Sequence, residues 1–284
     1  MATQTKAKII MQRHTEDFYH SAIKVTFPNS WDIRKPVICG AHSPVFLVDT
    51  PDGTQVCKFN DPELIFHNRT AGNLMQMYNI PTPQTAVHAY MDAWFETYPY
   101  CPDKTLQEYI DKAKITREQI FDAYKQAIDI QYKISQIPPI EFRPQTGKYF
   151  SDAFKTAIRW NMKRVMADTY ALVVKHMSEY GESRLLHNDI HAKNILVDKD
   201  FNVSRLIDLD AIAVCNDDFS VLQTFRTYPL NNYGEYMDYY EDTMGRKLNR
   251  NVIMGTLRFL RLIQTQRRKL DALFWKGEYP NQQR

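Results

Sequence analysis

The sequence lacks any uninterrupted apolar run of the roughly 20 residues that a membrane-spanning helix needs. Its first residues, MATQTKAKIIMQRHTEDF, are too polar for a secretory signal. The cysteines lie far apart and form no CxxC pair, which argues against a zinc ribbon and against a disulfide framework. We therefore expect a cytoplasmic protein that has no membrane partner.

Excess charge of one sign is also small, because the formal net charge is +3. Basic residues gather near the C-terminal end, in RFLRLIQTQRRKL, which we interpret as an amphipathic helix with a solvated basic side. We do not expect nucleic acid to be a partner. Apolar residues make up 44% of the 284 residues, which is enough to bury a sizeable core.

The first hundred residues have the pattern of a small sheet with one helix. Short runs rich in β-branched and aromatic residues, PVFLVDT and QVCKF, flank an Asp52-Gly53 turn and predict an antiparallel hairpin. Asp61 and Pro62 then predict the start of a helix that ends before IPTP. A further strand pair is expected in QTAVHAYMDAWFETYP.

After Pro102 the pattern becomes helical. Thr116 and Gln119 form a capping box ahead of apolar residues at helical spacing, and a longer helix is expected from Ser151 to Tyr180. One polar hairpin interrupts these helices: NILVD and VSRLIDLD are expected to be two strands joined by a turn at residues 198–202. A β-rich lobe followed by a helical lobe predicts a two-lobed α+β protein.

The polar residues of this hairpin have the types and the order that phosphoryl transfer requires. Asp189 is followed by Asn194 and, after two strands, by Asp208. In that chemistry one Asp accepts the proton of the substrate hydroxyl, and an Asn and a second Asp bind Mg²⁺. Upstream, Gly40 precedes the first hairpin and Lys58 lies on its second strand, where a lysine suits the nucleotide phosphates.

On these motifs the chain resembles the aminoglycoside phosphotransferase and choline kinase group of small-molecule kinases. The matching stretches are GAHSPVFLV…VCKF, NIPTP, LLHNDIHAKNIL and LIDLDAIAV. The resemblance implies a bilobal protein-kinase-like α+β fold. Residues 1–97 would be an antiparallel β-sheet lobe that binds nucleotide, and residues 98–284 a larger, mainly helical lobe with the substrate pocket.

The resemblance also implies a role for each matching residue. Asp189 would be the catalytic base, Asn194 and Asp208 the Mg²⁺ ligands, and Asp210 a support for the metal site. Contacts to the ATP or GTP co-substrate would come from the turn before the first hairpin, from its lysine and from the FETYPY hinge, through Gly40, Ser43, Lys58, Glu96 and Tyr98. The expected activity is transfer of the γ-phosphate to a hydroxyl of a small molecule, such as an aminoglycoside, choline or a sugar.

The chain departs from the group's pattern at three places. The phosphate turn has one glycine rather than several. Glu63 is the only acid in the helix that usually supplies the partner of the lysine, and Thr70 stands nearer the expected position, so a water or another carboxylate could take over. Ser220 stands where the group often has an acid.

Two other classes stay open. The set His187, Asp189, His191 and Asp208 also resembles a metal-dependent hydrolase, because imidazole and carboxylate together suit zinc or iron. A catalytically silent kinase fold that serves as a binding module is the third class. The acceptor pocket is expected among aromatic residues of the second lobe: Trp160, Tyr228, Tyr233, Tyr236, Tyr239, Tyr240 and Trp275.

Overall fold

The computed structural model describes residues 14–36, 43–139, 184–258 and 261. The chain divides into two compact units. Unit 1 combines Met1–Ile134 with Ala192–Ile212, and unit 2 combines Ser135–His191 with Ala213–Arg284. The predicted lobe boundary at residues 97/98 stays a prediction, and the helix predicted from Ser151 to Tyr180 lies outside the described residues.

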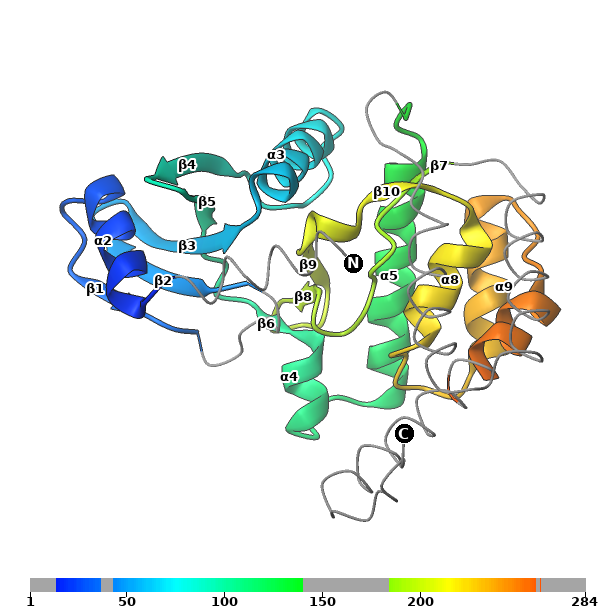
Figure 1. Cartoon of the computed structure of the whole chain (residues 1–284). Coiled ribbons are helices and arrows are strands. Elements are labelled where there is room, and N and C mark those ends of the chain that lie inside the picture. Colours follow the sequence, from blue (N-terminus) through cyan, green and yellow to red (C-terminus); the bar gives the residue numbers. More distant parts are fainter. Residues whose placement is uncertain (1–13, 37–42, 140–183, 259–260, 262–284) are drawn as a thin grey trace, which may run out of the picture. The chain divides into compact units, whose positions relative to one another are not determined.

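Unit 1 contains a five-stranded antiparallel sheet in the order β1-β2-β3-β5-β4 (Figure 1). The predicted hairpin is present, and Thr50 pairs with Gly53 across its turn. Gly53 has a φ of 108°, which a residue with a side chain rarely adopts. The strands are β1 (Asp32–Arg34), β2 (Val45–Thr50), β3 (Gly53–Asn60), β4 (Ala86–Tyr90) and β5 (Ala93–Pro99).

Helix α2 (Glu16–Thr26) packs its apolar residues on one face of this sheet. Thr15 caps it by accepting a hydrogen bond from the backbone N–H of Phe18, and two acids occupy the first turn. Tyr19 and Ile23 share a buried cluster with sheet residues that include Cys57, Phe59 and Phe95. The sequence analysis did not predict this helix.

Helix α3 (Pro62–Met77) lies on the opposite face of the sheet. Side chains alternate along a strand, so residues 58 and 96 point away from the cluster that holds Cys57, Phe59 and Phe95. Asn68 of α3 donates a hydrogen bond to Glu96 on that second face. As predicted, Asp61 caps the helix, and Pro62 occupies its first turn.

The remaining elements of unit 1 surround the polar hairpin. Strands β8 and β9 pair antiparallel as predicted, and β6 adds a third strand. Helix α5 begins at the predicted capping box, where Thr116 and Gln119 exchange backbone-to-side-chain hydrogen bonds of 3.0 and 3.2 Å. The bounds are β6 (Lys104–Thr105), α4 (Leu106–Asp111), α5 (Arg117–Ser135), β8 (Ile195–Val197), β9 (Val203–Leu206) and η1 (Leu209–Ala211).

The described part of unit 2 contains a short two-stranded sheet and helices. Asp217, only 1% exposed, accepts hydrogen bonds of 2.9 Å from Tyr240 and from Arg246. This buried carboxylate lies three residues before Ser220, in the same helix. The elements are β7 (Arg184–Leu186), β10 (Ala213–Cys215), α8 (Asp217–Phe225) and α9 (Tyr233–Met244), and residues 250–258 are also helical.

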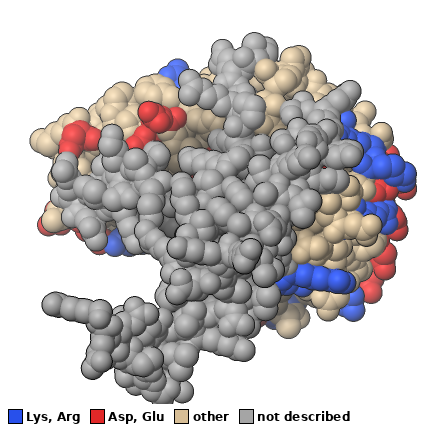
Figure 2. All heavy atoms as spheres, turned by 45° about the vertical axis from the view of Figure 1, so that its right-hand side comes forward, with Lys and Arg blue, Asp and Glu red and all other residues tan. Residues whose placement is uncertain are grey.

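Basic and acidic side chains lie next to one another on the described part of the face in Figure 2. The described ion pairs of unit 2 include Arg250 with Asp238 at 2.6 Å and with Glu241 at 2.9 Å.

In the described part of the chain, no helix is long and apolar enough to cross a membrane.

Glu241 of α9 provides a first testable prediction. Its buried carboxylate accepts hydrogen bonds from Arg250, Lys247 and the backbone N–H of Leu248, and these contacts, that of Arg250 first, lower the pKa of Glu241 to about 2. Because the folded pKa lies below the unfolded one, this stabilisation is complete above about pH 5 and is lost as the pH falls towards 2.

We expect Glu241→Gln to lower the free energy of unfolding by about 2 kcal/mol at pH 7, after allowance for the exposed Lys247 and Arg250. The loss should shrink as the pH falls below the ordinary pKa of 4.5, because Glu241 then takes up its proton in the unfolded chain before it does so in the folded protein. Urea unfolding of both proteins at pH 7 and pH 3 measures this difference. An equal loss at both pH values would contradict the role of the charge.

Candidate nucleotide and catalytic site

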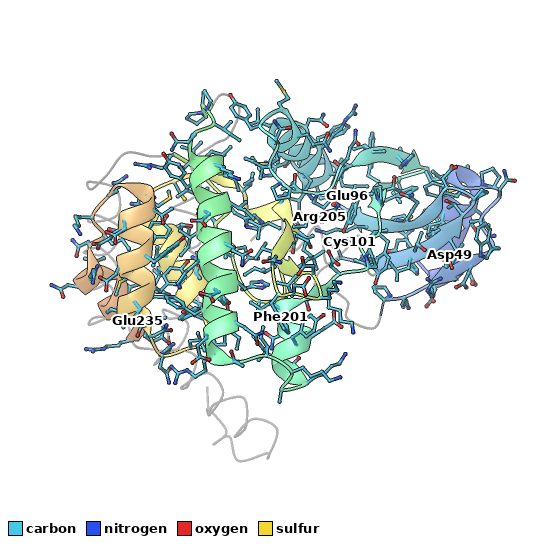
Figure 3. All side chains as sticks on the ribbon, turned by 180° about the vertical axis from the view of Figure 1, so that it is seen from behind. Asp49, Glu96, Cys101, Phe201, Arg205 and Glu235 are labelled. Atoms are coloured by element: carbon cyan, nitrogen blue, oxygen red, sulfur yellow. The ribbon has the colours of Figure 1, made fainter. Side chains whose placement is uncertain are left out.

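Lys58 lies on the central strand β3, opposite Glu96 on β5 in the antiparallel register. Residues that face each other across two strands point to the same side of the sheet, so the register brings the ammonium and the carboxylate together. The distance from Lys58 Nζ to Glu96 Oε1 is 4.0 Å. In Figure 3, Glu96 lies towards the end of the sheet near α3, and Asp49 lies at the other end.

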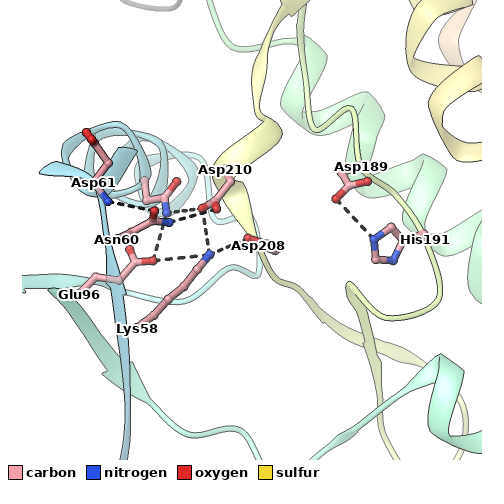
Figure 4. A network of polar contacts seen from close by, with 9 residues as sticks. Lys58, Asn60, Asp61, Glu96, Asp189, His191, Asp208 and Asp210 are labelled. Atoms are coloured by element: carbon pink, nitrogen blue, oxygen red, sulfur yellow. Dashed lines mark hydrogen bonds and ion pairs between the residues drawn. The ribbon is translucent and has the colours of Figure 1, made fainter. Parts of the chain in front are cut away.

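Two further carboxylates contact Lys58 from the segment that follows β9. Lys58 Nζ donates to Asp208 Oδ1 at 2.7 Å and to Asp210 Oδ1 at 3.0 Å (Figure 4). Burial acts to lower the pKa of Lys58, but the charges of Asp208, Asp210 and Glu96 outweigh burial and raise this pKa above its ordinary value. Lys58 is therefore a buried cation at neutral pH.

A tight turn brings both aspartates to the lysine. Asp208 has a φ of 64°, in the left-handed region that residues other than glycine rarely adopt. The short helix η1 follows at once, and its residue Leu209 is 3% exposed, which anchors the turn in the core. Backbone conformations of this kind cost on the order of 1–3 kcal/mol and gather at functional sites.

Helix α3 completes the polar cluster with an amide. Asn68 Nδ2 donates to Glu96 Oε1 at 3.0 Å and to Asp210 Oδ1 at 2.5 Å, and Asn68 is 2% exposed. Asn60, at the end of β3, approaches Asp210 Oδ2 at 3.5 Å. Burial raises the pKa of Glu96 to about 7, because Lys58 and Asn68 oppose the burial effect only in part.

Asn194 directly precedes β8, and Asp208 follows β9, so both residues lie at the open end of the β8–β9 hairpin. Its backbone carbonyl accepts a hydrogen bond of 3.0 Å from Ile207, the residue before Asp208, so the hairpin itself brings the two residues to one end. Asn194 is 5% exposed. An amide oxygen and a carboxylate are hard oxygen donors that suit Mg²⁺, which takes its remaining ligands from phosphates and water.

Asp189 lies in unit 2, on the loop that follows β7. Its carboxylate is 3.4 Å from His191 Nε2. The preceding Asn188 has a φ of 58° and is held by hydrogen bonds to the carbonyls of Leu186 at 3.2 Å and Ala213 at 3.5 Å. Cys215 also donates to Asn188 Oδ1, at 2.7 Å. The loop therefore rests on a buried amide that lies directly before Asp189.

The other predicted site residues have different positions. Gly40 lies outside the described residues, and Ser43 is half-buried just before β2. Tyr98 is on β5, and burial raises the pKa of its hydroxyl. The segment predicted to be a hinge is largely part of strand β5. This strand pairs with β3 up to Pro99 and with β4 up to Thr97. The predicted contacts of Gly40, Ser43, Glu96 and Tyr98 with the nucleotide stay predictions.

Several aromatic residues that were predicted to line the acceptor pocket are buried in unit 2. The rings of Tyr236 and Tyr240 are 1% exposed and belong to its core, and Tyr228 is 6% exposed. Trp160 and Trp275 lie outside the described residues. Within the described ranges, no group of three or more His, Cys, Asp or Glu side chains is arranged to hold a metal ion.

The fold is that of the small-molecule phosphotransferases, which confirms the predicted kinase-like α+β class. An aminoglycoside-3'-phosphotransferase of type VIII matches with a TM-score of 0.62 and 12% identity over 86% of this chain and 97% of its own. A spectinomycin phosphotransferase solved with ADP and spectinomycin matches with a TM-score of 0.59 and 13% identity, over 88% and 86% of the two chains.

A choline kinase from Streptococcus pneumoniae matches with a TM-score of 0.58 and 11% identity, over 88% of this chain and 92% of its own. No protein-family model and no curated protein sequence matches the chain. At these identities the likeness extends to the fold, in agreement with the resemblance that the sequence motifs suggested.

Proposed function

We propose that the protein transfers the γ-phosphate of ATP or GTP to a hydroxyl group of a small molecule. The observation that carries this proposal is the contact of the buried Lys58 with Asp208 and Asp210, in a chain whose fold is that of phosphotransferases. A buried ammonium held by carboxylates beside an oxygen-donor pair has the charges that a metal-bound triphosphate requires.

Each residue has a separate task in this proposal. Lys58 binds phosphate oxygens of the nucleotide, while Asn194 and Asp208 hold Mg²⁺. When bound, the metal neutralises negative charge on the phosphate groups. Asp189 accepts a hydrogen bond from the acceptor hydroxyl, orients its oxygen towards the γ-phosphorus and takes its proton as the bond forms. Asp210 supports the metal site through its contacts with Lys58 and Asn68.

The remaining contacts with the nucleotide come from the turn before β2 and from strand β5, which pairs with the β3 strand that carries Lys58. In the proposal the turn that contains Gly40 and Ser43 covers the phosphates with its backbone. The backbone of β5 near Glu96 and Tyr98 lies against the purine base. The acceptor is a small alcohol, as in the proteins of like fold that are named for aminoglycosides, spectinomycin, macrolides and choline.

A transfer screen tests the proposal. γ-Labelled ATP and GTP are each incubated with Mg²⁺, the protein and a panel of aminoglycosides, macrolides, choline, sugars and nucleosides. We expect label to move to at least one acceptor, and the product to release phosphate on treatment with a phosphatase. Thermal stabilisation by nucleotide without transfer to any acceptor would favour the silent binding module instead.

A further inference from the structure

One carboxylate partner of Lys58, Glu96, lies on a neighbouring strand rather than on helix α3. Glu96 faces Lys58 across the β3–β5 ladder and is 2% exposed. A strand pair fixes the separation of two side chains through its backbone hydrogen bonds, so this carboxylate stays beside the lysine as long as the sheet is intact.

Helix α3 supplies an amide at the place where a helix acid would act. Its only acidic residue, Glu63, is exposed in the first turn. Asn68, on the buried side of the helix, instead donates to Glu96 Oε1. The amide therefore holds one oxygen of the strand carboxylate in place and adds no negative charge of its own.

The second oxygen of Glu96, Oε2, is buried and has no hydrogen-bond partner among the residues that the structure describes. Lys58 is nearer to Asp208, at 2.7 Å, than to Glu96, at 4.0 Å. The oxygen of Glu96 nearest to Lys58 is Oε1, which also accepts from Asn68, so a shift of the ammonium away from Asp208 would bring it against this carboxylate oxygen. Glu96 thus offers Lys58 a further anchor beside Asp208 and Asp210, which it contacts now.

We propose that Glu96, held by Asn68, is the positioning residue that keeps Lys58 directed at the nucleotide phosphates once Asp208 is engaged by metal. This inference rests on the proposed function, since it assumes that Lys58 binds phosphate. In this inference a carboxylate on strand β5, rather than one on helix α3, holds the ammonium of Lys58 in position.

The test uses Glu96→Gln, which keeps the shape of the side chain and removes its charge. Affinities for ATP with Mg²⁺ and for adenosine are measured by calorimetry on the full chain. Because Lys58 contacts only the phosphates, we expect ATP affinity to fall about tenfold, a change of about 1.4 kcal/mol, while adenosine affinity is unchanged. The melting temperature without nucleotide should stay within about 3 °C of wild type.

Glu63→Gln is the matched control, because it makes the same change at an exposed position of unit 1. It should leave both affinities as in the wild type. If Glu96→Gln keeps the wild-type ratio of ATP to adenosine affinity, the inference is overturned, and the same holds if both affinities fall together. Should Glu96→Gln fail to fold, Glu96→Asp applies the same ratio test with a carboxylate that is shorter by one methylene.

Different results would contradict the proposed function and the positioning role of Glu96. Wild-type protein that binds ATP no better than adenosine would contradict the role of Lys58 and with it the proposed function. Wild-type protein that prefers ATP, together with a Glu96→Gln variant that keeps this preference, would contradict the role of Glu96 alone.

Discussion

Asp189→Asn is expected to lower the turnover of phosphate transfer by about 10²- to 10⁴-fold, because an amide cannot take the proton of the acceptor hydroxyl. The substitution keeps the shape of a side chain that is 42% exposed, so folding should be preserved. ATP affinity should also stay near the wild-type value, since the phosphate contacts proposed for Lys58, Asn194 and Asp208 are untouched. Single-turnover transfer of labelled phosphate, together with calorimetry of ATP binding, measures both effects.

Asp200→Asn is the control for this experiment. Asp200 is exposed in the turn between β8 and β9, and its substitution should leave turnover unchanged. An Asp189→Asn protein that transfers phosphate at the wild-type rate would remove Asp189 from the mechanism.

Lys58→Met is expected to abolish measurable ATP binding and to destabilise the protein by about 3 kcal/mol at pH 8. The substitution leaves the buried Glu96 and the half-buried Asp210 without the cation that now lies 4.0 and 3.0 Å from them. Urea unfolding in the absence of nucleotide measures the loss of stability.

The loss should be smaller at pH 5. Burial already raises the pKa of Glu96, and Lys58 opposes that rise, so without the lysine this carboxyl takes up a proton at a still higher pH. The raised pKa of Glu96 in the folded variant lowers the free energy of unfolding most above that pH. The loss decreases as the pH falls from there towards the pKa of the unfolded chain. Lys112→Met, at a lysine whose side chain is 54% exposed, should change stability by less than about 1 kcal/mol. An equal and small loss for both variants would contradict the buried network.

Local signals in the sequence predicted the elements that carry the site. The Asp52-Gly53 turn fixed the β2–β3 hairpin, Asp61 with Pro62 marked the start of α3, and residues 198–202 marked the turn of the polar hairpin. These features depend on the conformations of a few neighbouring residues, so they can be recognised without knowledge of the tertiary structure.

The carboxylate that pairs with Lys58 was not predicted, because its position depends on strand register. Glu96 and Lys58 are far apart in sequence, and only the β3–β5 pairing sets them opposite each other. The expectation for Glu96 was a contact with the nucleotide from the FETYPY hinge, although FETYP was also included in the predicted strand pair. A lack of acids on the buried side of α3 was the signal that another carboxylate would be needed.

Two further features were missed for different reasons. Helix α2 has a sequence signal, since Thr15 precedes two acids and the apolar residues Tyr19 and Ile23 follow at helical spacing. The support of Asn188 by Cys215 and Ala213 has no local signal, because β10 brings these residues to it from a distant part of the chain.

A crystal structure with Mg²⁺ and a non-hydrolysable ATP analogue tests the central claim most directly. The account predicts the ammonium of Lys58 at hydrogen-bonding distance from phosphate oxygens. It also predicts the metal between Asn194 and Asp208, and Asp189 facing the γ-phosphate across the space for an acceptor hydroxyl. A nucleotide bound away from Lys58, or an Asp189 carboxylate remote from the γ-phosphate, would contradict it.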